Sequence, residues 1–369
     1  MKRTITVVYD GTGYTFCWLK TLLWAKDTFK ERGYYVKFSS LKGYFPIGDR
    51  MIMLEKEAEK SHDIVFLAFH HSTSILSSLD NEKLFSILSK FKRNSTMVCW
   101  MDTADSTGTT MFQVMPYVDL YFKKQWLKNK EIYFKHMQGG RIYTNYYYDK
   151  YKLDSMETEK KEYELLSKKY ISKCRTSWNV GLGDLYAHNG IKKYLKYNEM
   201  EKISYISPKM EKIYDVHFRG SAYPSAVGYQ RYLTLQILMK MSQVMLPEDL
   251  EIKVTKEAYI EEVKKSKIVI SPFGWGEICT RDFESFAYGA LLFKPNMNHM
   301  ETFPDWYIDN TYISIDWDFS DFSNLLDQYL SDNQKRIEIA ELAQERFRKY
   351  RTTAFGRKEF VNHIISELQ

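Results

Sequence analysis

The stretch 265–294 constrains the fold most, because a short apolar strand, a glycine-containing loop, a helix and a second strand follow one another in it. The β-branched run 268–270 predicts a buried strand. Residues 271–277 carry a proline and two glycines, which is typical of a loop. A helix is expected over about 280–288, before a strand at 290–293. This βαβ unit places its loop at the carboxyl end of a strand, where open α/β sheets bind ligands.

Two polar side chains of this unit have a spacing that suits a nucleotide. Arg281 and Glu284 are three residues apart and therefore share one face of the helix. Arg281 belongs to the first turn, where backbone N–H groups and the helix dipole favour an anion such as a diphosphate. Glu284 can accept two hydrogen bonds from adjacent ribose hydroxyls. From spacing alone, a weak surface ion pair between the two residues is an equally good interpretation.

The segment SPFGWGEICTRDFESFAYGALLF resembles the donor-nucleotide motif of GT-B glycosyltransferases, in particular its exostosin-like and CgeB-like form. The residues that match the motif are Pro272, Gly274, Gly276, Arg281, Glu284, Ser285 and Gly289. The resemblance implies that Glu284 holds the donor ribose, and that Arg281 and the glycine loop hold the diphosphate. The commoner group-1 enzymes place two glutamates one residue further apart than Glu277 and Glu284. Glu277 is therefore not assigned the role of their first glutamate.

The composition describes a soluble globular chain with room for two domains. It has 369 residues, of which 44% are hydrophobic and 27% are charged. The four cysteines are widely spaced and form no CxxC pair, which favours a reducing cytoplasm over a disulfide framework or a zinc site. The net charge of +6 permits weak attraction to anionic lipid or to an anionic acceptor and establishes neither, so peripheral association with the inner face of the membrane is compatible with the expected cytoplasmic location. No nucleic-acid-binding motif accompanies this charge, and we expect no nucleic-acid partner.

The first half of the chain alternates short apolar runs with helical segments. Strands are expected at 4–9, 34–38, 63–69, 95–100 and 118–122, and this rhythm predicts a parallel, doubly wound sheet. The first strand leads into Asp10-Gly11-Thr12-Gly13 and a helix over about 15–32. These glycines suggest a dinucleotide fingerprint, but its third glycine and its acidic residue are missing. A tight strand-to-helix turn facing a cleft is the favoured interpretation.

Ionisable side chains follow two of these strands and are candidates for a catalytic base. His70 and His71 come directly after 63–69, and imidazole titrates near neutral pH. Asp102 and Asp105 follow the strand at 95–100 and can bind an acceptor hydroxyl or remove its proton. The structural alternatives are that one histidine packs while the other is solvated, and that the aspartates cap the next helix.

The second half of the chain begins a new α/β module after Pro208. Arg219, Gly220 and Ser221 follow a strand at 214–218, and the resemblance implies that this turn faces the donor diphosphate. By pattern alone an ordinary strand-to-helix turn is the favoured interpretation. Tyr259 follows an expected strand at 250–254, and the family layout places this region near the donor base.

We therefore expect two Rossmann-like domains, 1–207 on the acceptor side and 208–369 on the nucleotide-sugar side, with a C-terminal helix that crosses back to the first domain. The resemblance implies a metal-independent transfer of a sugar from a UDP- or GDP-sugar to a hydroxyl of a glycan or lipid-linked glycan, as in polysaccharide biosynthesis. It also implies an inverting reaction, which needs a base; a retaining reaction would not. The alternatives are a nucleotide-sugar epimerase or hydrolase on the same scaffold, and a noncatalytic nucleotide- or carbohydrate-binding protein.

Overall fold

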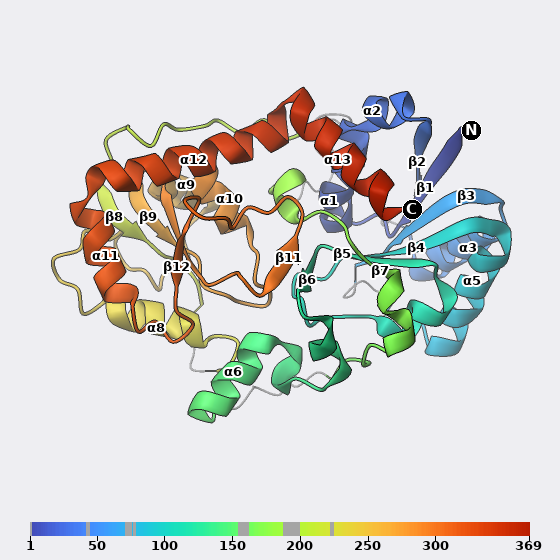
Figure 1. The fold of residues 1–369 in the computed structure, drawn as a ribbon, viewed down its shortest axis with the longest axis horizontal. Coiled ribbons are helices and arrows are strands. Elements are labelled where there is room, and N and C mark those ends of the chain that lie inside the picture. Colours follow the sequence, from blue (N-terminus) through green and yellow to red (C-terminus); the bar gives the residue numbers. More distant parts are fainter. Residues whose placement is uncertain are drawn as a thin grey trace.

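The computed structural model describes two α/β domains, each built on a parallel sheet (Figure 1). This arrangement confirms the predicted fold class. The residues described are 2–41, 45–70, 76, 79–153, 162–186, 200–221 and 225–369.

The N-terminal sheet has six strands in the order β2-β1-β3-β4-β5-β7, and every neighbouring pair is parallel. The central strands are buried along most of their length because helices cover both faces of such a sheet, which is why their sequences read as continuous apolar runs. The strands are β1 (Arg3–Tyr9), β2 (Tyr34–Ser40), β3 (His62–Ala68), β4 (Ser95–Asp102), β5 (Leu120–Lys123) and β7 (Cys174–Thr176).

The helices of this domain begin at side-chain caps that the sequence supplies. Thr12 caps the first helix by accepting from the Thr15 amide at 3.3 Å, and Asp80 caps α5 by accepting from the Lys83 amide at 2.7 Å. The single helix expected at 15–32 is divided near Ala25 into two. The helices are α1 (Gly13–Trp24), α2 (Lys26–Glu31), α3 (Ile47–Ala58), α5 (Asn81–Asn94) and α6 (Ile142–Tyr151).

The C-terminal sheet has four parallel strands in the order β12-β10-β9-β8. Its centre is the predicted βαβ unit, now β9 (Ser266–Ile270), α10 (Thr280–Ala287) and β10 (Leu291–Pro295). The remaining elements are β8 (Tyr214–His217), β12 (Ile313–Ile315), α8 (Tyr229–Leu238), α9 (Lys256–Lys264), α11 (Phe322–Ser331), α12 (Asn333–Thr352) and α13 (Ala354–Glu367).

The prediction of a strand at 250–254 is wrong, because that segment is a loop. The Arg219 guanidinium accounts for its irregular path. It donates to the backbone carbonyls of Asp249 and Ile252 at 2.8 and 2.9 Å, and carbonyls used in this way are not available to a sheet. Asp249 also has a positive φ of 45°, which a strand does not accommodate.

Two elements of secondary structure link the domains. β6 (Gln125–Leu127) of the first domain pairs antiparallel with β11 (Met300–Thr302) of the second. The long helix α12 runs along the top of Figure 1 and leads into α13. The helix α13 contacts α2 of the N-terminal domain. The C-terminal helix therefore crosses back to the N-terminal domain, as the sequence predicted.

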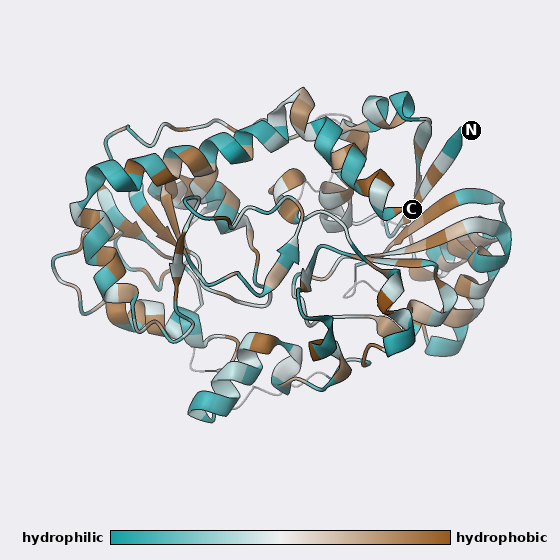
Figure 2. Cartoon of the chain, in the orientation of Figure 1, coloured by the Kyte–Doolittle hydropathy of each residue, from teal (hydrophilic) through white to brown (hydrophobic). Residues whose placement is uncertain are grey.

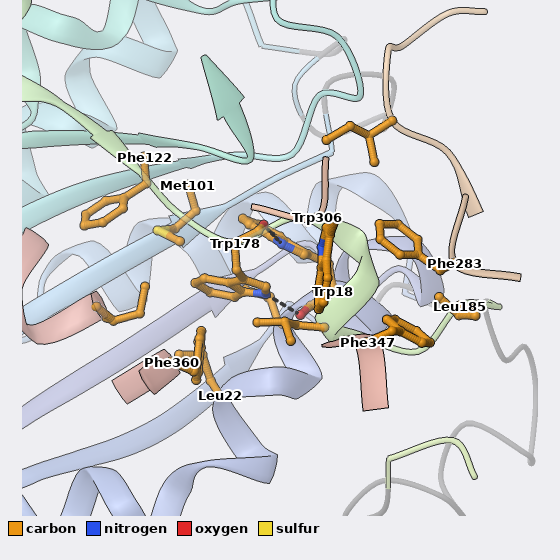
Figure 3. Close-up of a cluster of buried hydrophobic side chains, with 14 of the residues drawn as sticks. Trp18, Leu22, Met101, Phe122, Trp178, Leu185, Phe283, Trp306, Phe347 and Phe360 are labelled. Carbon is orange, nitrogen blue, oxygen red and sulfur yellow. Dashed lines mark hydrogen bonds between the residues drawn. The ribbon is translucent and has the colours of Figure 1, made fainter. Parts of the chain in front are cut away.

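The core continues from one domain into the other. Trp18 and Trp178 stack with ring centroids 4.7 Å apart, and each indole N–H donates to the backbone carbonyl of the other (Figure 3). Trp306, Phe283 and Phe347 of the C-terminal domain belong to the same buried cluster. Figure 2 shows hydrophobic residues concentrated along the strands of both sheets. None of the helices in the described ranges is long and apolar enough to cross a membrane.

Candidate functional site

A cleft of about 340 Å³ lies between the two domains, at the carboxyl ends of β1, β3 and β4 and against the loop between β9 and α10. This is the position in which α/β sheets bind ligands. Both domains contribute to its walls. The lining residues are Tyr14, Thr15, Cys17, Trp18, His70, Thr103, Asp105, Lys124, Val180, Asp184, Leu185, Arg231, Pro272, Gly274, Trp275, Gly276, Ile278, Cys279 and Thr280.

The loop between β9 and α10 is pressed against the N-terminal domain. A Cβ atom on Gly276 would lie 2.1 Å from the Asp105 carbonyl oxygen, so only glycine permits this approach. The buried Glu277 carboxylate accepts from the Thr107 amide at 3.0 Å and from the Thr107 hydroxyl at 2.6 Å. Glu277 therefore holds the two domains together, which agrees with not assigning it a donor role.

The other glycine of this loop makes room for a cation. A Cβ atom on Gly274 would lie 1.7 Å from Nη2 of Arg231, whose guanidinium lines the cleft from the first turn of α8. The Gly274 carbonyl accepts a hydrogen bond from the Tyr143 hydroxyl, and Arg141 Nε donates to the Trp275 carbonyl at 3.0 Å. The loop is thus fixed from both sides before any ligand binds.

The first turn of α10 reaches the cleft through Thr280 and is anchored from below by a buried ion pair. Asp282 accepts from Lys294 Nζ at 2.9 Å, and both side chains are fully buried. The Tyr307 hydroxyl donates to the same carboxylate at 2.6 Å. Asp282 also accepts from the Cys279 amide at 3.3 Å and so caps the helix, while Lys294 offsets the charge that this carboxylate brings to the turn.

Arg281 and Glu284 lie together beside the cleft, bridged by Tyr259. Arg281 Nε donates to the Tyr259 hydroxyl at 3.4 Å, and that hydroxyl donates to Glu284 Oε2 at 2.9 Å. The Tyr186 hydroxyl donates to the other carboxylate oxygen. Glu284 is only 2% exposed, so the pair is not a solvated surface ion pair. Burial raises the pKa of the Glu284 carboxyl, and the tyrosine hydrogen bonds oppose that shift.

The Arg219 side chain is not brought to the cleft. Its Nε and Nη2 donate to the two carboxylate oxygens of Glu262 at 2.6 and 2.8 Å, and its other contacts are carbonyls of the loop before α9. Only its backbone carbonyl approaches the site, where it accepts from Arg281. Gly220 lies beside Arg281, and Ser221 is exposed; neither is among the lining residues described.

Of the four candidate bases, the structure brings His70 and Asp105 to the cleft. Burial, together with the nearby Lys124 charge, lowers the pKa of His70 below its ordinary value of 6.5. The Asp105 carboxylate is more than half exposed and lies 3.1 Å from Lys124 Nζ. Asp102 is instead buried against Lys123 at 3.0 Å and the Tyr121 hydroxyl at 2.5 Å, which makes it a structural ion pair. His71 lies outside the described residues.

The turn 10–13 directly precedes Tyr14 and Thr15, which line the cleft, but none of its own residues is among the lining residues described. Asp10 organises it by accepting from the Thr12 amide at 2.9 Å and the Thr15 hydroxyl at 3.0 Å. The same carboxylate accepts from the His70 amide at 2.7 Å, which fixes the end of β3 beside α1. These contacts give Asp10 a structural role in positioning Tyr14 and His70.

Most of the lining residues were not singled out from the sequence, among them Tyr14, Trp18, Lys124, Arg231 and Trp275. Lys124 directly follows β5, so its place at the carboxyl end of a predicted strand was an available signal. Trp275 lies inside the motif itself. Arg231 carried no local signal, because the turn of α8 that faces the cleft depends on how that helix packs. Among the described residues, no group of three histidine, cysteine or acidic side chains could hold a metal ion.

No family model matches the chain, and no curated protein matches it. Solved structures with similar chain paths include an alpha-glucosyltransferase in complex with UDP-glucose and DNA containing an abasic site, at 11% identity, with 99% of each chain covered and a TM-score of 0.46. A UDP-N-acetylglucosamine 2-epimerase is 10% identical over 100% of this chain and 96% of its own, with a TM-score of 0.41. At these values neither similarity bears on function.

Proposed function

We propose that this chain is a metal-independent glycosyltransferase that moves a sugar from a UDP- or GDP-sugar to a hydroxyl of a glycan or lipid-linked glycan. One observation carries the proposal. The glycine loop and first turn of α10, which belong to the donor-like motif, form one wall of an interdomain cleft whose opposite wall presents His70 and Asp105. A donor seat and a candidate base therefore face the same space.

The donor nucleotide would bind along the C-terminal wall. Glu284 already accepts two hydroxyl hydrogen bonds, from Tyr186 and Tyr259, which is the arrangement that two ribose hydroxyls require. Because this carboxylate is 2% exposed, at least one tyrosine must move when ribose binds. The first turn of α10 and the Arg231 guanidinium would receive the diphosphate. Lys124 supplies a second cation from the facing wall.

The acceptor would bind against the N-terminal wall. Its hydroxyl oxygen would attack the anomeric carbon as the bond from that carbon to the diphosphate oxygen breaks. The nucleoside diphosphate leaves with the bonding electrons, and the acceptor proton passes to His70 or Asp105. Arg231 and Lys124 would offset the charge on the leaving group, so the proposed step requires no metal ion. The two candidate bases favour an inverting reaction, because a retaining one has no need of them.

The first test is binding. Purified protein is heated with UDP, GDP, CMP, ADP or dTDP, since a ligand that binds only the native state raises the melting temperature. We expect a shift with UDP or GDP that is lost in Glu284→Gln and retained in Glu261→Gln. Glu261 is a matched control because it is an exposed glutamate whose partner is Lys264 on the surface of α9. Equal shifts in both variants would refute the donor seat.

The second test is turnover of UDP- and GDP-sugars in the presence of EDTA. Release of nucleoside diphosphate that depends on an added glycan supports the proposal. Isomerisation or cleavage of the sugar without an acceptor would instead identify an epimerase or hydrolase. Tight binding without any turnover would identify a noncatalytic binding protein. Loss of turnover in EDTA that Mg²⁺ restores would contradict the metal-independent step.

A further inference from the structure

Two large aromatic side chains of the cleft remain in contact with solvent. Tyr14 is 74% exposed and Trp275 is 46% exposed, whereas Trp18 in the same cleft is 3% exposed. Folding normally removes such rings from water, and exposed apolar surface within a concave site marks a place where a ligand binds. The rings come from opposite walls, Tyr14 from the first turn of α1 and Trp275 from the loop before α10.

Trp275 is held in place before any ligand arrives. The Arg141 guanidinium lies 5.1 Å from the centre of its ring, and Arg141 Nε donates to its backbone carbonyl at 3.0 Å. The following residue, Gly276, packs on the Asp105 backbone. An indole fixed in this way loses little conformational freedom on binding, so its stacking surface is preorganised.

Each exposed ring has a candidate base as its neighbour. The rings of Tyr14 and His70 have centroids 6.0 Å apart. Trp275 adjoins Gly276, which touches Asp105. A ligand lying against these aromatic faces would therefore present its edge to His70 and Asp105. The ligand must combine an apolar face with hydroxyl groups around its rim, and a pyranose ring has that surface.

We propose that Tyr14 and Trp275 form an aromatic platform that binds the pyranose ring of a glycan acceptor. This inference rests on the proposed function and specifies its acceptor: a sugar ring rather than a lipid or protein hydroxyl. The platform orients the acceptor so that one sugar hydroxyl attacks the anomeric carbon and gives its proton to His70 or Asp105, while the nucleoside diphosphate leaves with the electron pair of the broken bond.

The experiment measures glycoside binding without any donor. The probes are p-nitrophenyl α- and β-glycosides of glucose, galactose, N-acetylglucosamine and N-acetylgalactosamine, and binding is followed by saturation-transfer NMR. We expect at least one probe to bind through its pyranose protons, and its affinity to fall about tenfold in Trp275→Ala and in Tyr14→Ala, which corresponds to about 1.4 kcal/mol. Trp275→Phe should retain most of the affinity. Phe355→Ala, which removes a 41% exposed ring from α13, is the matched control.

Several results would overturn the platform. One is the absence of binding by all of these glycosides, and another is equal affinity in wild-type protein, Trp275→Ala and Tyr14→Ala. A third is a loss of UDP-sugar affinity in these variants with unchanged glycoside affinity, because the rings would then contact the donor sugar. Melting temperature and UDP affinity report whether each variant is intact. Failure of the wild-type protein to bind any nucleotide refutes the donor assignment but leaves the glycoside measurement decisive for the platform.

Discussion

Glu284 is a buried carboxylate whose two oxygens each accept a tyrosine hydroxyl, and these hydrogen bonds stabilise it without a ligand. An unpartnered buried carboxylate is costly, and the two tyrosine hydroxyls supply the hydrogen bonds that offset this cost. Tyr186 and Tyr259 differ in one respect: Tyr259 also bridges to Arg281, whereas Tyr186 lies against Lys256, whose Nζ is 3.3 Å from its ring centre.

Tyr186→Phe is expected to tighten nucleotide binding. Ribose must displace a hydroxyl from Glu284, and removing the Tyr186 hydroxyl eliminates that competition while leaving the ring in place. A hydrogen bond to a charged group contributes roughly 1.5 kcal/mol or more, which corresponds to about a tenfold gain in affinity. Calorimetric titration of wild-type protein and Tyr186→Phe with the cognate nucleoside diphosphate measures this difference in affinity. Weaker binding in Tyr186→Phe would show that this hydroxyl contacts the ligand rather than replacing it.

The pH dependence of transfer should identify the base. His70 has a lowered pKa, so its imidazole is neutral at pH 7 and can accept a proton; the active form is lost only as the pH falls through that lowered value, below 6.5. In a pH–rate profile, kcat/KM should be level near pH 7–8 and decline in acid. His70→Asn should lower kcat by about 10²–10⁴-fold and abolish this acidic limb. If the decline of kcat/KM in acid persists in His70→Asn but is lost in Asp105→Asn, the base is Asp105.

At the scale of elements, the loop between β9 and α10 serves both domains. Its glycines permit contact with Asp105 and Arg231, and its Glu277 accepts hydrogen bonds from Thr107. The loop ends where α10 begins, the helix that carries Arg281 and Glu284. A movement of the loop therefore alters the domain interface and the cleft together. Gly276 is required because the loop meets the N-terminal domain, whereas Gly274 is required by the packing of α8 within the C-terminal domain.

Gly276→Ala should destabilise the protein by about 1–3 kcal/mol, because the new Cβ would overlap the Asp105 carbonyl group and force the loop to shift. Gly48→Ala is the contrasting variant. It lies in α3 with nothing within 4 Å of a new Cβ, so it should be neutral or stabilising by up to about 1 kcal/mol. Urea denaturation measures the free energy of unfolding of both variants. Equal stabilities of the two variants would contradict the close packing described here.

At the scale of the whole molecule, the cleft has its shape because the two domains share structure. The β6–β11 ribbon, the Glu277–Thr107 contact and the buried Asn179 all cross the interface; Asn179 Nδ2 donates to the Phe303 carbonyl at 3.1 Å. The helix α13 adds a further link, with Phe360 set between Phe29 and Trp178 at centroid distances of 5.9 and 5.1 Å. We therefore expect the domains to unfold together.

Phe360→Ala tests this coupling. Phe360 is fully buried, and its truncation leaves a cavity between α13 and the N-terminal domain, with an expected cost of about 3–5 kcal/mol. Phe355→Ala on the same helix removes a ring that is 41% exposed and should cost no more than about 0.5 kcal/mol. Calorimetry should show one transition that shifts downward in Phe360→Ala. Two separate transitions, with only one of them shifted, would show that the domains unfold independently.

Local sequence determined the elements of this protein. Apolar strands, glycine loops and helix caps between β1 and β10 follow from periodicity and from the steric demands of single residues, and those rules act over a few positions. The same rules placed the motif 271–289 at the end of a strand. They failed at 250–254, where the distant Arg219 guanidinium took the carbonyls that a strand would have used.

Tertiary structure decided which side chains meet. Asp102 ends β4 and Asp105 follows three residues later, yet one is buried against Lys123 and the other faces the cleft. Arg219 is drawn to Glu262, while Arg231, which had no local signal, lines the cleft from α8. The reason is physical: a charged side chain settles where its desolvation is offset by partners, and those partners come from segments that are far apart in the sequence.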